Sequence, residues 1–153
     1  MNRNHWLALA IALSALPQAA VAQTWKRGHG NGHDYVEMAS RERGASLRIE
    51  SGDRSELWLR YYPPRTWNGA EKVSVRAGNF TSAMEIDGGD GALLSNVSNN
   101  GIGITRNLVD AIKSSQSLVI EGPATARVPL GQRHFALPDA RSVIGQLEKR
   151  CGK

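Results

Sequence analysis

Short segments in which hydrophobic and polar residues alternate make up most of the chain from residue 35 onward. In residues 56–62, Leu57, Leu59 and Tyr61 occupy every second position, so an extended backbone would place them on one face. Segments of this kind, bounded by Gly, Pro, Asn and Asp, are typical of antiparallel strands. The pattern predicts strands at residues 35–39, 46–50, 56–62, 72–75, 79–86, 92–94, 101–104, 117–121, 126–130 and 134–137.

Two other segments have helical spacing instead of alternation. Residues 107–114 predict a short helix capped by Asn107, and residues 139–151 predict an amphipathic helix capped by Asp139. The apolar stripe of the second helix consists of Ala140, Val143, Ile144, Leu147 and Cys151. Because this stripe needs a partner surface, we expect an antiparallel β-sandwich or barrel-like sheet with both helices packed on it.

The first 22 residues have the organisation of a secretory signal peptide. A short polar start containing Arg3 precedes an apolar run from Trp6 to Leu16, and Ala20-Val21-Ala22 provides small residues before a cut. The run is shorter than the span that a bilayer requires, so we expect no transmembrane segment after cleavage. The sequence therefore predicts a leader at 1–22 and one β-rich domain at 23–153, which is exported to the periplasm or secreted.

The formal net charge is +5, with 19 basic and 14 acidic residues. Acids and bases alternate along the chain, as in Arg41-Glu42-Arg43, which indicates a mixed solvated surface and not a stripe that binds nucleic acid. The basic excess still permits a salt-sensitive attraction to anionic components of the envelope.

Cys151 is the single cysteine, so the exported domain has no internal disulfide. Two interpretations are open. The thiol either packs as a small apolar group on the last turn of the helix, or it forms an intermolecular disulfide or reacts as a free thiol.

His29, His33 and Asp34 form a candidate metal site near the predicted mature start. Two imidazoles and a carboxylate suit zinc, copper or nickel. The residues around them are rich in glycine, however, which favours a flexible loop without the rigidity that aligns ligands.

Aromatic and basic residues from Trp58 to Trp67 form a candidate surface for sugars or for a protein partner. Trp58, Arg60 and Tyr62 would share one strand face, with Arg65 and Trp67 close behind in sequence. In the alternative, the C-terminal helix covers this face and Trp58 belongs to the core.

Motifs of catalysis are missing from the sequence: it has no Gly-x-Ser-x-Gly, no His-Glu-x-x-His and no phosphate-binding loop. Glu50, Glu56 and Glu85 could serve as acid and base only if the fold brought them together. We therefore expect a non-enzymatic binding module without a cofactor. The alternative is an envelope hydrolase or a periplasmic metal-binding protein.

The C-terminal third resembles small exported bacterial proteins of the invasion-associated locus B family. The resemblance rests on the segments 108–112, 117–120 and 135–137 and on the apolar stripe of the last helix, ending in Cys151. It implies an amino-terminal β region and a non-enzymatic role in the cell envelope or in host interaction, through an envelope or secreted protein partner.

One position departs from that family. Its members usually carry a second cysteine after an early strand, where this chain has Glu50-Ser51. The disulfide that the resemblance implies is therefore absent, and packing must supply the stability that the bridge would have contributed.

Overall fold

The computed structural model describes residues 23–42, 44–52, 56–63, 72–87, 92–95, 103–122 and 131–151. Within these ranges the strands are β1 (Lys26–Gly30), β2 (His33–Ala39), β3 (Ser46–Ser51), β4 (Leu57–Tyr62), β5 (Lys72–Ala77), β6 (Phe80–Asp87), β7 (Ala92–Ser95), β8 (Ser117–Glu121) and β9 (Gln132–Ala136). Helix α1 (Arg106–Ser114) precedes β8, and α2 (Ala140–Glu148) follows β9. The predicted leader, the predicted strand at 126–130, and Arg65 and Trp67 lie outside the described residues.

The described strands form one antiparallel sheet in the order β1-β2-β3-β4-β7-β6-β5-β8-β9. This sheet curls strongly, because the rings of Tyr61 on β4 and Phe135 on β9 meet edge to face at 6.4 Å although four strands lie between them in the order. The sheet stays open, since β1 and β9 do not pair with each other in the described part. The prediction of a mainly β fold is confirmed, and the arrangement is one curled sheet.

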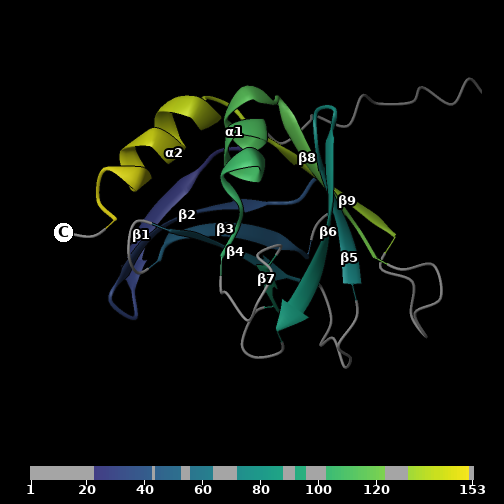
Figure 1. The fold of residues 1–153 in the computed structure, drawn as a ribbon, viewed down its shortest axis with the longest axis horizontal. Helices are drawn as coiled ribbons and strands as arrows, with labels where there is room; N and C mark the ends of the chain where they lie inside the picture. Colours follow the sequence, from purple (N-terminus) through teal and green to yellow (C-terminus); the bar gives the residue numbers. More distant parts are fainter. Residues whose placement is uncertain are drawn as a thin grey trace, which may run out of the picture.

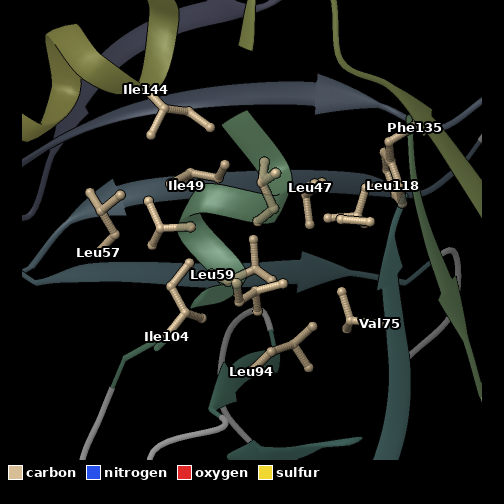
Figure 2. Packing of buried hydrophobic residues seen from close by; sticks show 14 of the residues in the cluster. Leu47, Ile49, Leu57, Leu59, Val75, Leu94, Ile104, Leu118, Phe135 and Ile144 are labelled. Atoms are coloured by element: carbon tan, nitrogen blue, oxygen red, sulfur yellow. The ribbon is translucent and has the colours of Figure 1, made fainter. Parts of the chain in front are cut away.

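Both helices cover the same face of this sheet (Figure 1). Helix α2 contacts β2 and β3, α1 contacts β5 and β6, and the two helices touch each other. The core fills the space between them, and Figure 2 shows Leu47, Ile49 and Leu59 in it. Each of these side chains is fully buried, which contributes about 1.5–3 kcal/mol to the free energy of unfolding.

The predicted stripe of the C-terminal helix is buried as expected, and Asp139 occupies the predicted N-cap position of α2 but does not cap it with its side chain, whereas the predicted cap Asn107 is wrong. Asp139 precedes α2 in a left-handed conformation with φ 53° and forms no side-chain capping bond. Helix α1 begins at Arg106 after Thr105, which places Asn107 inside the helix. Asparagine and aspartate suit caps in general, whereas the tertiary path of the chain decides whether the side chain reaches the free N–H groups.

The glycine-rich segment before β2 is a strand, so the predicted flexible loop at this place is wrong. Residues Lys26–Gly30 pair with β2 from Lys26↔Glu37 to Gly30↔His33. Asn31 and Gly32 form the turn with φ of 52° and 81°, as a two-residue hairpin with positive φ at both positions requires. Gly28 is needed here because a Cβ would lie 2.3 Å from the Tyr35 ring.

The outer edge of β9 is capped by residues from the beginning of the domain. The backbone N–H of Arg41 donates to the His134 carbonyl at 2.9 Å, and the Glu42 carboxylate accepts the His134 N–H at 2.9 Å. Gln23 accepts the Ala136 N–H at 2.8 Å and donates to the Ala39 carbonyl. Side chains and turn backbone thus take the place of a neighbouring strand.

Candidate functional site

Eight side chains of β2, β3 and β4 point away from the helices. Their chain neighbours, such as Val36, Ile49 and Leu59, are buried in the core, and successive residues of a strand alternate between faces. The surface formed in this way is termed the outer face, and it comprises His33, Tyr35, Glu37, Arg48, Glu50, Trp58, Arg60 and Tyr62.

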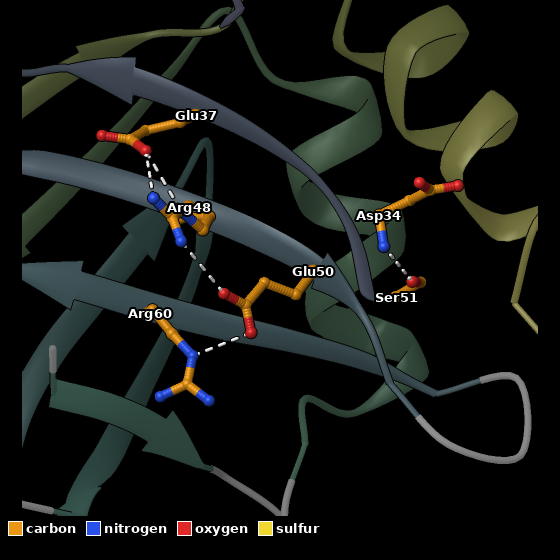
Figure 3. A network of polar contacts seen from close by, with 6 residues as sticks. All are labelled: Asp34, Glu37, Arg48, Glu50, Ser51 and Arg60. Carbon is orange, nitrogen blue, oxygen red and sulfur yellow. Dashed lines mark hydrogen bonds and ion pairs between the residues drawn. The ribbon is translucent and has the colours of Figure 1, made fainter. Parts of the chain in front are cut away.

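Alternating charges run across the outer face from β2 to β4 (Figure 3). Glu37 accepts hydrogen bonds from Arg48 Nη2 at 2.7 Å and Nε at 3.1 Å. Glu50 lies 3.6 Å from Arg48 Nη1 and accepts a 2.8 Å hydrogen bond from Arg60 Nε. The two carboxylates therefore hold both guanidinium groups in fixed positions.

Glu50 is the buried member of this network. Its side chain is only 8% exposed, whereas those of Arg48 and Arg60 are 24% and 27% exposed. Arg60 bonds to Glu50 through Nε. Its two terminal Nη atoms form no hydrogen bond or ion pair with another described residue. These two nitrogens are donors that a partner molecule can use.

Aromatic rings complete the outer face. The Arg48 guanidinium lies 3.9 Å from the Tyr35 ring centroid and 5.1 Å from that of Tyr62, so two phenol rings flank one cation. The rings of His33 and Trp58 contact each other with centroids 4.8 Å apart. Burial raises the pKa of Tyr62, which keeps its hydroxyl protonated and able to donate at neutral pH.

Trp58 is half-buried on the outer face and lies outside the core cluster. Its indole covers Gly52, where a Cβ would lie 2.4 Å from Nε1. Nε1 itself is buried without a hydrogen-bond partner among the described residues. Trp58, Arg60 and Tyr62 thus share a face, as alternation predicts, and this face is opposite to the one that the helices cover.

Sequence reasoning missed the contributions of β2 and β3 to this surface. Tyr35 and Glu37, like Arg48 and Glu50, occupy alternate positions of their strands, so the sequence carries the signal for a polar face. What it lacks is the register, which sets Arg48 opposite both Glu37 and Arg60.

The three residues of the candidate metal site do not converge. His29 Nδ1 and Asp34 Oδ1 are 2.9 Å apart across the β1–β2 hairpin, whereas His33 lies on the outer face against Trp58. The hydrogen bond from His29 and the nearby Arg150 lower the pKa of Asp34. Among the described residues, no group of three or more His, Cys, Asp or Glu side chains is placed to hold a metal ion.

Cys151 is buried in the turn that follows α2, so the helix predicted to reach residue 151 ends at Glu148 instead. Its thiol contacts the carbonyl oxygens of Glu56 at 3.6 Å and Leu147 at 3.5 Å. Burial raises the pKa of the thiol, and the nearby negative charges of Glu148 and Asp34 raise it further. The thiol is therefore protonated at neutral pH and has the packing role of a small apolar group.

The candidate acid and base residues are spread over different strands and pairings. Glu50 is bound to two arginines on β3 and β4, while Glu85 on β6 is 75% exposed and lies 3.4 Å from Lys72. Glu56 precedes β4 at the start of a described segment. Among the described residues, none of these three carboxylates is paired with another of the three as an acid and base would be.

No protein-family model, curated protein or solved structure matches this chain. Across the described ranges, the structure contains no helix of the length and apolarity needed to cross a membrane. The outer face therefore stands as a candidate site on its own geometry.

Proposed function

We propose that the protein is an exported, non-enzymatic interaction module of the bacterial envelope, and that its outer face binds an envelope or secreted protein. The observation that carries this proposal is the pair of arginines held by carboxylates, with Arg48 also between two aromatic rings and with the terminal nitrogens of Arg60 unpaired among the described residues. Tyr, Trp and Arg are the residue types that dominate binding energy at protein interfaces.

Rigidity supports the same proposal. Arg48 is fixed by Glu37 and by two phenol rings, and Arg60 is fixed by Glu50, so little side-chain freedom would be lost when a partner binds. The predicted export signal at 1–22 and the resemblance to the invasion-associated locus B family support a partner in the envelope or outside the cell.

The test is affinity capture from a periplasmic extract, using the mature protein as bait with crosslinking and mass spectrometry. The bait is compared with Arg60→Gln, which keeps an N–H donor for Glu50 and removes the terminal guanidinium nitrogens. Arg141→Gln is the control, because Arg141 is exposed on α2, on the opposite side of the sheet.

We expect one envelope or secreted protein to be enriched by the unmodified bait and by Arg141→Gln, and to be lost with Arg60→Gln. Equal enrichment by all three baits would contradict the assignment of the outer face. Failure of the unmodified bait to enrich any such protein would contradict the proposed function itself.

A further inference from the structure

The two edges of the sheet differ in how they are protected. The β9 edge is capped by Gln23, Arg41 and Glu42, as described above. At the other edge, β1 pairs with β2 on one side and with no described strand on the other. An unpaired edge of this kind is a template on which another strand can add.

The hairpin geometry determines which backbone groups of β1 face outward. In a two-residue hairpin, Gly30 and His33 form the hydrogen-bonded pair that closes the turn, and such pairs alternate along the ladder. Gly28 and Lys26 therefore also bond to β2, whereas the N–H and C=O groups of Arg27 and His29 point away from it. These outward groups form no backbone hydrogen bond among the described residues.

A small groove open to solvent lies beside β1 and beneath α2. Figure 1 shows α2 above this end of the sheet. Val36, Val143 and Leu147 give the groove apolar walls, and Arg27 and Arg150 contribute its positive charges. Asp34, also in the lining, is already paired with His29 and Arg150.

We propose that β1 binds an extended acidic segment of a partner protein as an additional strand. The outward groups of Arg27 and His29 would form the backbone hydrogen bonds. A carboxylate of the segment would lie beside the Arg27 guanidinium, which has no ion-pair partner among the described residues. An apolar side chain two residues away in the segment, on the same face, would enter the groove against Val143 and Leu147.

Charge favours this occupant over a second copy of the chain. The strand Lys26–Gly30 carries two cations and no acid, so a second copy of β1 would add positive charge to this edge without a carboxylate to pair with it. An acidic strand instead meets Arg27, and Arg150 beside it in the groove, with complementary charge.

The probe is a fluorescein-labelled peptide, Thr-Glu-Thr-Val-Thr-Glu-Thr, whose acidic and apolar side chains share one strand face. Its binding is followed by fluorescence anisotropy and compared with that of the analogue in which Lys replaces Glu. The decisive variants are His29→Pro and His29→Ala. Both lose the imidazole, but only proline removes the outward N–H, and it does so without breaking a bond to β2.

We expect His29→Pro to bind the peptide about tenfold more weakly than His29→Ala, because a strand hydrogen bond is lost. Arg27→Glu should weaken binding of the Glu peptide and strengthen that of the Lys peptide. On binding, amide hydrogen exchange should slow at Arg27 and His29. Circular dichroism of the two His29 variants should be the same, which shows that both fold.

Equal affinities of the two His29 variants would overturn the proposal, and so would the absence of saturable binding at millimolar peptide. A dimer that buries β1 without peptide would also overturn it. Arg60→Gln should leave peptide binding unchanged, since the outer face is a separate surface. The failure of one proposal is therefore distinguishable from the failure of the other.

Discussion

Neighbouring residues of β4 show how single side chains divide the sheet into a core face and the outer face. Tyr61 is fully buried and contacts Phe135, while Trp58 and Tyr62 on the same strand are half-buried on the outer face. Burial raises the pKa of Tyr61 to about 12, and its hydroxyl has no hydrogen-bond partner among the described residues.

Replacing Tyr61 with phenylalanine is expected to stabilise the protein. A buried hydroxyl without a partner costs about 1–3 kcal/mol, and Tyr61→Phe removes it while keeping the ring against Phe135. Urea unfolding should show a higher midpoint with an unchanged slope. A midpoint lowered by the substitution would mean that the hydroxyl makes a stabilising bond.

Trp58→Ala and Leu59→Ala form a matched pair on adjacent positions and opposite faces of β4. Leu59 is fully buried, so its truncation should lower the free energy of unfolding by about 2–5 kcal/mol. Trp58 is half-buried outside the core, and its loss should cost about 1 kcal/mol and leave the chain folded. Urea titration of both variants checks this order. If Trp58→Ala alone unfolds the protein, Trp58 contributes to the core and the assignment to the outer face is wrong.

At the scale of elements, the β2–β3 turn holds the edge of β9 through one carboxylate. Glu42 accepts the His134 N–H and lies 2.5 Å from His134 Nδ1. Burial acts to raise the pKa of Glu42, but the hydrogen bonds from His134 outweigh it, so the pKa lies below its usual value of 4.5.

This lowered pKa predicts how the contact responds to acid. A carboxylate with a lowered pKa stabilises the fold fully above its unfolded value, and the stabilisation is lost as the pH falls through the folded pKa. The difference in unfolding free energy between the native chain and Glu42→Gln should therefore shrink as the pH falls from about 5 through 4.5 and below. Urea midpoints at each pH measure it, and a difference that grows over this range would contradict the contact.

Strand alternation was sufficient to predict most of the elements, and the exceptions have physical causes. The strand 117–121 agrees with β8 at both ends, because its apolar residues are bounded by polar ones. β1 was missed since its residues, Lys-Arg-Gly-His-Gly, include no large apolar side chain, and pairing with β2 stabilises it instead. The residues of β1 alone do not show that β2 will pair with them, so the strand could not be predicted from its own pattern.

At the scale of the whole molecule, the sequence predicts one strand of the candidate site but not its assembly. Alternation sets Trp58, Arg60 and Tyr62 on one face, whereas Arg48 reaches them only through the register of β3 with β4. The same reasoning explains the metal candidates: His29 and His33 lie on opposite faces because the turn at Asn31-Gly32 folds the segment into a hairpin.

The turn that follows α2 brings Cys151 back to the sheet, next to Gly52 after β3 and Glu56 before β4. The Cys151 thiol contacts the Glu56 carbonyl oxygen, and the Gly52 backbone forms a hydrogen bond with the same thiol. Ser51→Cys is therefore expected to form a disulfide with Cys151 under oxidising conditions. A bridge closing so long a loop should raise the free energy of unfolding by about 2–4 kcal/mol.

Ser46→Cys, at the opposite end of β3, is the matched control and should retain two free thiols. Thiol titration of the unfolded proteins distinguishes the two variants, and thermal unfolding with and without reductant measures the stabilisation. Two titratable thiols in oxidised Ser51→Cys would show that the end of α2 does not approach β3 closely enough.

Gln23 links the predicted cleavage of the leader to the protection of the β9 edge of the sheet. Its side chain bridges Ala39 and Ala136, and it is the first residue after the predicted leader. A cut after Ala22 would leave this bridge in place, with β1 as the exposed edge among the described strands. A cut one residue later would leave the Ala136 N–H without this acceptor, while Arg41 and Glu42 would still cap β9 at His134, so the edge would be open to another strand at one end only.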